Sequence, residues 1–124
     1  MITGGIAPRH PNLRMAYSHG GGVLSFLIAR LGRAWDILPK MRETLPEKPL
    51  AYAKKFYYDS IVFDPEAMHH VMKTFGASQV VAGSDFPFAM GDPDPVAFIK
   101  RLKLDAATER ALMADNAKRF LGLQ

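Results

Sequence analysis

Residues 14–38, with the sequence RMAYSHGGGVLSFLIARLGRAWDIL, decide the fold. They begin with a short apolar run, residues 14–18, of the kind typical of a buried strand, and His19 and three glycines end this run. Beyond the glycines, apolar residues recur with the spacing of an amphipathic helix, namely Leu24, Leu27, Ile28, Leu31, Trp35 and Leu38. Prolines at positions 39, 46 and 49 then predict a loop, with a short helix at residues 50–55.

A second strand–helix unit follows. Residues 56–59 are predicted to form a strand, with an extension through residues 61–63. Residues 64–66, Asp-Pro-Glu, indicate a helix start, because they place a capping carboxylate, a proline and an acid in the first turn. Gly76 is expected to end this helix in the left-handed conformation. The buried side of the helix is predicted to consist of Met68, Val71, Met72 and Phe75.

The third unit has the same order. Residues 79–83 predict a strand that ends at Ser84 and Asp85, and Asp94 with Pro95 indicates the start of the next helix. Further helices are predicted to begin at Asp105 and at residue 116. The inward side of the helix after Asp94 is predicted to consist of Val96, Ile99 and Leu102.

Three strand–helix units in succession predict an α/β fold with parallel strands and right-handed crossovers. A complete barrel of such units takes about 250 residues and eight strands, whereas this chain has 124 residues. We therefore expect residues 1–124 to form a single, partial barrel domain. Residues 1–6 contain neither a helix cap nor a complete strand, which favours a truncated chain.

Composition excludes several classes of protein. The chain has no cysteine, so it forms no disulfide and has no thiolate metal site or cysteine nucleophile. It has no apolar run of about 20 residues, so we expect no membrane association and a cytoplasmic location. Nine of the 16 Lys and Arg residues lie in residues 1–55, but no recognition-helix or aromatic-strand pattern accompanies them. Nucleic acid is therefore not expected as a partner.

Three side chains are candidates for chemistry, because active sites of α/β proteins lie at the carboxyl ends of the strands. His19, Asp59 and Asp85 each follow a predicted strand. For Asp59 a structural role is favoured, whereas His19 and Asp85 are the candidate catalytic pair. The three glycines after His19 indicate either a close backbone approach to an anionic ligand or room for a tight turn.

Four segments together carry a resemblance to a known family. They are YSHGGG at residues 17–22, YDSIVFDP at residues 58–65, GSDFPF at residues 83–88 and NAKRFLG at residues 116–122. The chain resembles the amidohydrolase superfamily, and within it the amidohydrolase-2 or aminocarboxymuconate-semialdehyde decarboxylase-like family. This resemblance implies the C-terminal three βα repeats of a TIM (β/α)8 barrel.

The resemblance also implies roles for three residues. Asp85 matches a ligand of a single divalent metal, usually zinc, and His19 matches the histidine that activates water or assists proton transfer. Arg30 matches an arginine that grips a substrate carboxylate in a neighbouring subunit's site, which implies a homo-oligomer; a solvated surface arginine is the alternative. The implied reaction is decarboxylation or hydrolysis of a small carboxylate substrate derived from an aromatic or muconate-like acid.

The chain also departs from the family pattern. Its histidines are His10, His19, His69 and His70, and none forms the His-x-His pair that complete members carry. His69 and His70 are consecutive in a predicted helix and are expected to be a surface pair. Since zinc takes about three protein ligands, we expect the isolated chain to bind metal weakly or not at all, and to be inactive. The alternative is a non-catalytic α/β module that associates with itself or with another chain through its sheet edges.

Overall fold

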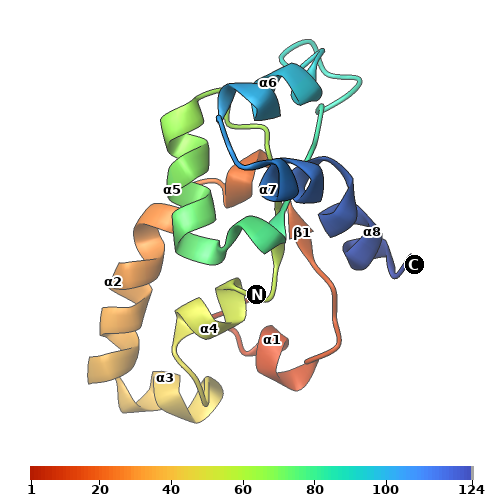
Figure 1. Ribbon diagram of the computed structural model, residues 1–124. Coiled ribbons are helices and arrows are strands. Elements are labelled where there is room, and N and C mark those ends of the chain that lie inside the picture. Colours follow the sequence, from red (N-terminus) through yellow and green to blue (C-terminus); the bar gives the residue numbers. More distant parts are fainter. Residues whose placement is uncertain (124) are drawn as a thin grey trace.

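The centre of the molecule is a three-stranded parallel sheet, seen in a computed structural model that describes residues 1–123 (Figure 1). Its strands are β1 (Ala16–Tyr17), β2 (Tyr57–Asp59) and β3 (Val80–Val81), in the order β1-β2-β3. Tyr17 pairs with Tyr58, and Tyr58 pairs with Val80, so β2 is the central strand. The predicted α/β class with parallel strands is confirmed.

Helices connect and cover the strands. Those between β1 and β2 are η1 (His19–Gly21), α2 (Leu24–Ile37), α3 (Pro39–Thr44) and α4 (Pro49–Ala53). Those between β2 and β3 are α5 (Pro65–Phe75) and η2 (Ala77–Gln79). The chain begins with α1 (Ile6–Arg9), and after β3 it forms α6 (Pro95–Arg101), α7 (Ala106–Arg110), η3 (Ala111–Asp115) and α8 (Asn116–Leu121).

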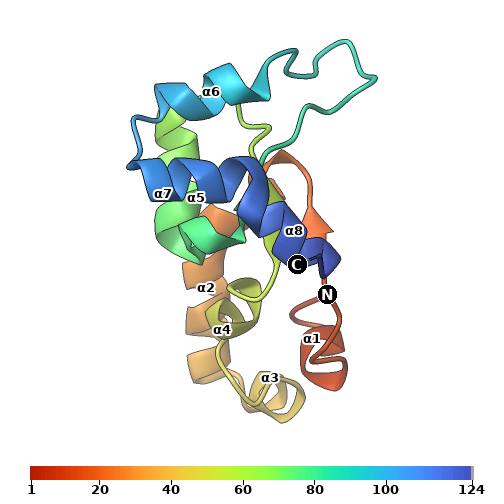
Figure 2. The same cartoon turned by 45° about the vertical axis from the view of Figure 1, so that its right-hand side comes forward.

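The main core lies between the sheet and helices α2, α4 and α5, which gather on one face of the strands (Figures 1 and 2). Tyr58 is fully buried there, stacked on Phe75 with 4.3 Å between ring centroids. Its hydroxyl donates to the Ala53 carbonyl oxygen at 2.8 Å. Burial raises the pKa of Tyr58 well above its ordinary value, so the hydroxyl remains a protonated donor.

The predicted helix starts are confirmed by side-chain capping bonds. Asp64 accepts a hydrogen bond from the Ala67 N–H at 2.8 Å, and Asp94 accepts one from Ala97 at 2.9 Å. Asp105 accepts two, from the N–H groups of Ala107 (3.0 Å) and Thr108 (2.9 Å). Hydrogen bonds from Thr108 hold the pKa of Asp105 below its ordinary value. The predicted buried stripe of α5 is also confirmed: Met68, Val71, Met72 and Phe75.

Several predicted details are wrong. Residues 61–63 turn instead of extending β2, and Phe63 has a φ of 58°. Pro39 begins helix α3 rather than a loop, because the first position of a helix needs no N–H donor. Val96, in the first turn of α6, is exposed, whereas Phe98 and Ile99 further along the helix are buried in the core. Exposed residues predicted to be inward also include Leu27 and Leu38. Gly76 has positive φ but a ψ of 136°, outside the left-handed helical region.

The C-terminal helices form one run, since the π-helical turn η3 joins α7 to α8 without a break. This run lies against β3. The Ala82 N–H donates to the Leu112 carbonyl in η3 at 2.9 Å. Phe120 of α8 packs on Tyr57 with ring centroids 5.1 Å apart, on the sheet face opposite Tyr58. Within residues 1–123, no helix combines the length and apolar character that crossing a membrane would require.

A buried amide fastens α8 to β3. Asn116 is 1% exposed, and its Nδ2 donates to the carbonyl oxygens of Ala77 (2.9 Å) and Val80 (2.6 Å). Its Oδ1 accepts from Arg119 Nη2 at 2.9 Å, and Arg119 Nε donates to the Tyr57 hydroxyl at 3.1 Å. Because every polar atom of the Asn116 side chain is paired, its burial stabilises the C-terminal run.

We expect Asn116→Ala to lower the free energy of unfolding by about 2–3 kcal/mol, because two buried carbonyls lose their donor. Chemical denaturation followed by circular dichroism measures the change. Lys118→Ala, on the exposed side of the same helix, is the matched control and is expected to change stability by less than about 0.5 kcal/mol. Equal losses in the two variants would contradict the role given to Asn116.

Candidate active site

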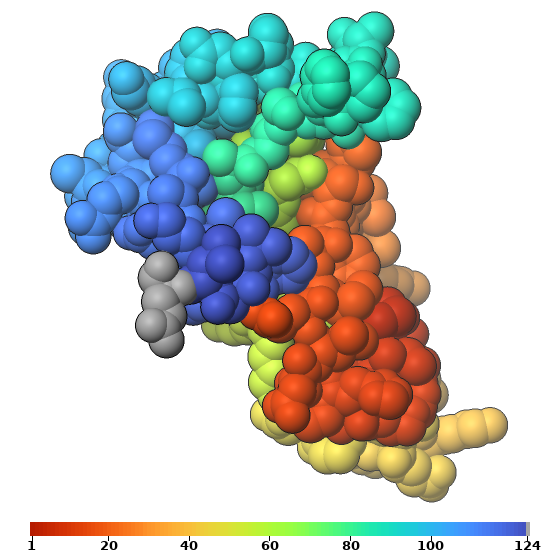
Figure 3. All heavy atoms as spheres, turned by 90° about the vertical axis from the view of Figure 1, so that its right-hand side faces the viewer, coloured from red at the N-terminus to blue at the C-terminus, as the bar shows by residue number. Residues whose placement is uncertain are grey.

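The carboxyl ends of the strands bring together two of the predicted site residues. His19 follows β1 and Asp85 follows β3, and His19 Nε2 lies 3.6 Å from Asp85 Oδ2. The imidazole is 58% exposed and the carboxylate 23%. In the side view of Figure 3, green and yellow-green atoms of the central segments reach the surface between orange atoms and the blue C-terminal helices. The expected convergence of His19 and Asp85 is therefore observed, although β2 lies between their strands.

Both residues have an unusual backbone conformation. His19 has a φ of 56° and Asp85 a φ of 59°, in the left-handed region that side chains other than glycine seldom occupy. Such conformations cost free energy and persist only where surrounding contacts impose them, as they often do at functional sites. The two turns are therefore held by interactions with the rest of the fold.

Asp59, at the end of β2, supplies some of these interactions. Its Oδ1 accepts hydrogen bonds from the N–H groups of Gly20 (3.0 Å) and Ile61 (3.1 Å). The structural role predicted for Asp59 is confirmed by these contacts. The next residue, Ser60, is 2% exposed, and its Oγ accepts from the Gly83 N–H at 3.2 Å. Sequence reasoning did not find this role of Ser60, because nothing local indicates which distant N–H a serine will meet.

The structure decides between the two alternatives for the triple glycine. The Gly21 N–H donates to the Ser18 carbonyl at 3.0 Å, and the Gly22 N–H donates to the His19 carbonyl at 2.8 Å. Since the Gly20 N–H is bonded to Asp59, all three donors are used inside the fold rather than offered to an anion. A Cβ on Gly21 would lie 2.7 Å from the Tyr58 ring, so the glycines provide room for a tight turn.

The segment after Asp85 forms a loop that reaches outward beside α6 (Figures 1 and 2). The Phe88 N–H donates to the Asp85 carbonyl at 3.0 Å, and the Asp92 N–H donates to the Ser84 carbonyl at 2.8 Å. These bonds close residues 84–92 on themselves. Phe86, Phe88 and Met90 are all strongly exposed on this loop, beside a hollow of about 560 Å³. Apolar surface is therefore exposed on the segment that follows Asp85.

Arg30 lies elsewhere. It is exposed on α2, and within residues 1–123 it forms no hydrogen bond or ion pair with His19 or Asp85. Val23, Phe26 and Leu27 share its helix face and are also exposed. Arg30 therefore lies beside an exposed apolar surface on α2.

The other histidines do not join the site. His69 is exposed on α5, as predicted. The expectation of a surface pair is wrong for His70, which is half-buried, with Nε2 3.3 Å from the Ser25 carbonyl oxygen and its ring stacked on Phe26 at 4.7 Å. His70 therefore contributes to the contact between α5 and α2.

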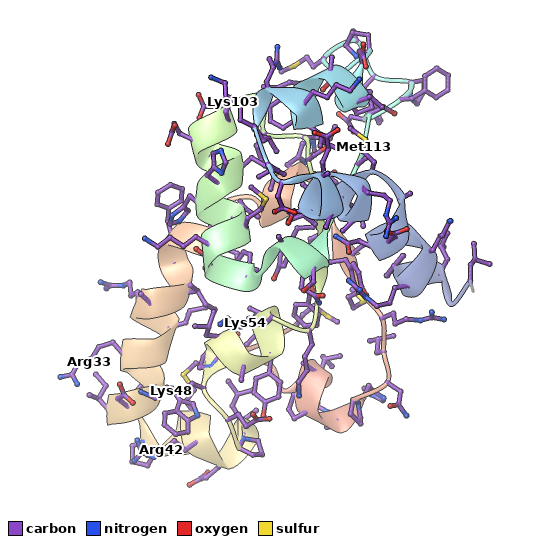
Figure 4. All side chains as sticks on the ribbon, in the orientation of Figure 1. Arg33, Arg42, Lys48, Lys54, Lys103 and Met113 are labelled. Atoms are coloured by element: carbon purple, nitrogen blue, oxygen red, sulfur yellow. The ribbon has the colours of Figure 1, made fainter. Side chains whose placement is uncertain are left out.

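Some of the Lys and Arg side chains of residues 1–55 make contacts within the fold. Arg33, Arg42 and Lys48 lie around the end of α2 remote from the strand ends (Figure 4). Arg42 Nη1 donates to the carbonyls of Trp35 (2.9 Å) and Asp36 (2.8 Å), which caps the C-terminal end of α2. Lys48 Nζ lies 2.6 Å from Asp36 Oδ1. Arg42 and Lys48 therefore stabilise the α2–α3 corner.

The site offers few ligands for a metal ion. Across residues 1–123, no three His, Asp or Glu side chains gather closely enough to hold an ion. A protein zinc site uses about three or four ligands. The carboxylate of Asp85, with the imidazole of His19 beside it, therefore fits part of a metal site and not a whole one.

Comparisons with known proteins place this fold in a family. The amidohydrolase family profile matches residues 1–123. A 2-amino-3-carboxymuconate-6-semialdehyde decarboxylase from Dictyostelium discoideum is 36% identical over 99% of this chain, which covers 35% of that protein. The chain belongs to the amidohydrolase family, and the resemblance inferred from its motifs is confirmed.

Solved structures agree on the fold. A 5-carboxyvanillate decarboxylase from Sphingomonas paucimobilis superposes with a TM-score of 0.86 at 22% identity, over 100% of this chain and 38% of that one. A dihydroxybenzoic acid decarboxylase from Polaromonas, solved with manganese and an inhibitor, gives a TM-score of 0.83 at 19% identity, over 98% of this chain and 37% of that one. The chain thus spans little more than a third of the length of these relatives.

We expect Gly21→Ala to destabilise the chain by about 1–3 kcal/mol more than Gly22→Ala, because only the first would place a Cβ against the Tyr58 ring. Both glycines have positive φ, so each variant carries backbone strain, and only Gly21→Ala adds a steric contact with the Tyr58 ring. Thermal or urea unfolding measures it. If both variants unfold at the same point, the turn does not need glycine for close packing.

Proposed function

We propose that this chain provides the C-terminal part of the active site of a metal-dependent decarboxylase of the amidohydrolase family. In this proposal the chain contributes His19 and Asp85 at the mouth of a (β/α)8 barrel, and is inactive without the remaining barrel strands. The observation that carries the proposal is the 3.6 Å separation of His19 Nε2 and Asp85 Oδ2 at the carboxyl edge of a parallel sheet.

Asp85 would be a ligand of the metal. Its carboxylate is partly buried, and backbone hydrogen bonds from Phe88 to Asp85 and from Asp92 to Ser84 hold its turn. Carboxylate oxygens suit both zinc and manganese, and the Polaromonas relative holds manganese, so both ions are candidates. When bound, a divalent metal would polarise a substrate oxygen or lower the pKa of a bound water. The other ligands would come from barrel strands outside residues 1–124.

His19 would donate the proton that the substrate carbon takes up after decarboxylation. Loss of carbon dioxide leaves electrons on the substrate carbon, which must then accept a proton. An imidazole near neutral pH can carry that proton, and the exposed His19 ring lies beside Asp85. The neighbouring carboxylate would orient the ring.

A small carboxylated substrate of aromatic or muconate-like origin suits this site. The Dictyostelium, Sphingomonas and Polaromonas relatives are all named as decarboxylases of such acids. The exposed rings of Phe86 and Phe88 would offer a planar substrate an apolar surface beside the metal ligand. Decarboxylation is therefore favoured over hydrolysis.

Arg30 would act in a second subunit. It projects from the exposed apolar face formed by Val23, Phe26 and Leu27, a surface suited to contact between two copies. There its guanidinium would grip a substrate carboxylate through paired hydrogen bonds. The proposal therefore includes a homo-oligomer.

The proposal can be tested in a chimera in which this chain replaces the matching C-terminal third of the Dictyostelium relative. We expect the chimera to bind metal and release carbon dioxide, and the 124-residue chain alone to do neither. In the chimera, His19→Asn should lower kcat by about 10²- to 10⁴-fold while metal is retained. Asp85→Asn should lower the metal content measured by elemental analysis.

Asp64→Asn is the matched control for the loss of one carboxylate, because asparagine caps a helix as well as aspartate does. It should leave both metal content and turnover unchanged. Full activity in the His19→Asn chimera, or unchanged metal content in the Asp85→Asn chimera, would reject the assignment of that residue. A chimera that folds but binds no metal would favour the non-catalytic module.

A further inference from the structure

We infer that Asp59 and Ser60 are positioning residues that set the separation of His19 and Asp85. They lie at the end of the central strand, and the side-chain oxygen of each accepts a hydrogen bond from a backbone N–H in the turn after one flanking strand. Their importance for catalysis rests on the function proposed above, whereas the positioning itself is a property of this chain.

Asp59 holds the turn that carries His19. Its Oδ1 accepts from the N–H of Gly20, the residue immediately after His19, at 3.0 Å. The same oxygen accepts from Ile61 at 3.1 Å, which closes the turn after β2. One carboxylate oxygen therefore joins the ends of β1 and β2, and bonds to an ionised acceptor are stronger than neutral ones.

Ser60 holds the segment that leads to Asp85. Its buried Oγ accepts from the N–H of Gly83, two residues before Asp85, at 3.2 Å. Close packing reinforces this bond, since a Cβ on Gly83 would lie 3.0 Å from the Asp59 Cβ. The end of β2 is therefore in direct contact with the segment that leads to Asp85.

Strain at both turns makes such support necessary. His19 and Asp85 have left-handed backbones that would relax if nothing opposed it. The two residues follow strands that are not adjacent, and β2, which carries Asp59 and Ser60 at its end, lies between them. A purely local role for Asp59, closing its own turn through Ile61, would leave the flanking turns unaffected when the carboxylate is removed.

Amide hydrogen exchange and chemical shifts, measured by NMR on the 124-residue chain, distinguish these roles. In Asp59→Ala we expect the Gly20 amide to exchange about tenfold faster or more, relative to the buried Val71 amide in α5, with displaced His19 ring resonances. In Ser60→Ala the Gly83 amide should respond in the same way, with displaced Asp85 resonances. Asp59→Asn, which keeps an oxygen acceptor without the charge, should speed Gly20 exchange by a smaller factor.

Asp105→Ala is the matched control, because Asp105 also accepts two backbone N–H bonds through one oxygen, at the start of α7. It should leave the His19 and Asp85 resonances in place. If exchange at Gly20 and Gly83 rises no more than at Val71, the side chains serve general stability and the inference is overturned. Should Asp59→Ala fail to fold, unchanged Gly20 exchange in Asp59→Asn would overturn it equally.

The chimera gives the functional measurement. Asp59→Ala should lower kcat by about 10- to 100-fold while KM stays within about twofold, because misplacement of reacting groups affects the chemical step, and Asp59→Asn should recover part of the loss. Unchanged kcat in an active Asp59→Ala chimera would overturn the inference. An inactive native chimera would instead reject the proposed function, and the exchange rates would still decide whether Asp59 and Ser60 position the two turns.

Discussion

The parallel pairing of β2 with both of its neighbours is the constraint on which the rest of the structure depends. Tyr58 pairs with Tyr17 on one side and with Val80 on the other, so all three strands end at the same edge. Parallel pairing requires crossovers, and α2 and α5 return the chain while covering one face of the sheet. The candidate site exists because this arrangement brings residues from distant parts of the chain to one place.

The site residues take their conformation from neighbouring segments. His19 and Asp85 occupy left-handed backbone regions, and hydrogen bonds to Asp59 and Ser60 lie beside both turns. The three glycines allow Gly21 to approach the Tyr58 ring closely, which binds the turn to the core. Contacts with the surrounding residues thus offset the backbone strain at His19 and Asp85. Such strain is expected at a site where the positions of the side chains matter more than local stability.

Membership of the amidohydrolase family explains what this chain has and what it lacks. It covers 35% of the Dictyostelium relative and carries one carboxylate and one imidazole at the strand ends. Metal sites in proteins need more ligands than this pair supplies. One face of the sheet is well covered by helices, whereas exposed apolar residues remain on α2 and on the loop after Asp85. Both features support the proposal that the chain works together with further barrel strands.

The sequence by itself determined the order of strands and helices, the capping residues Asp64, Asp94 and Asp105, and the candidacy of His19 and Asp85. Capping and apolar periodicity act over a few residues, so they can be recognised without knowing the fold. Only the tertiary structure decided the extra helix α3, the exposure of Val96, the partners of Ser60 and the distance between His19 and Asp85. These depend on which distant segments come into contact, and parallel register and packing across the sheet fix those contacts, not local propensity.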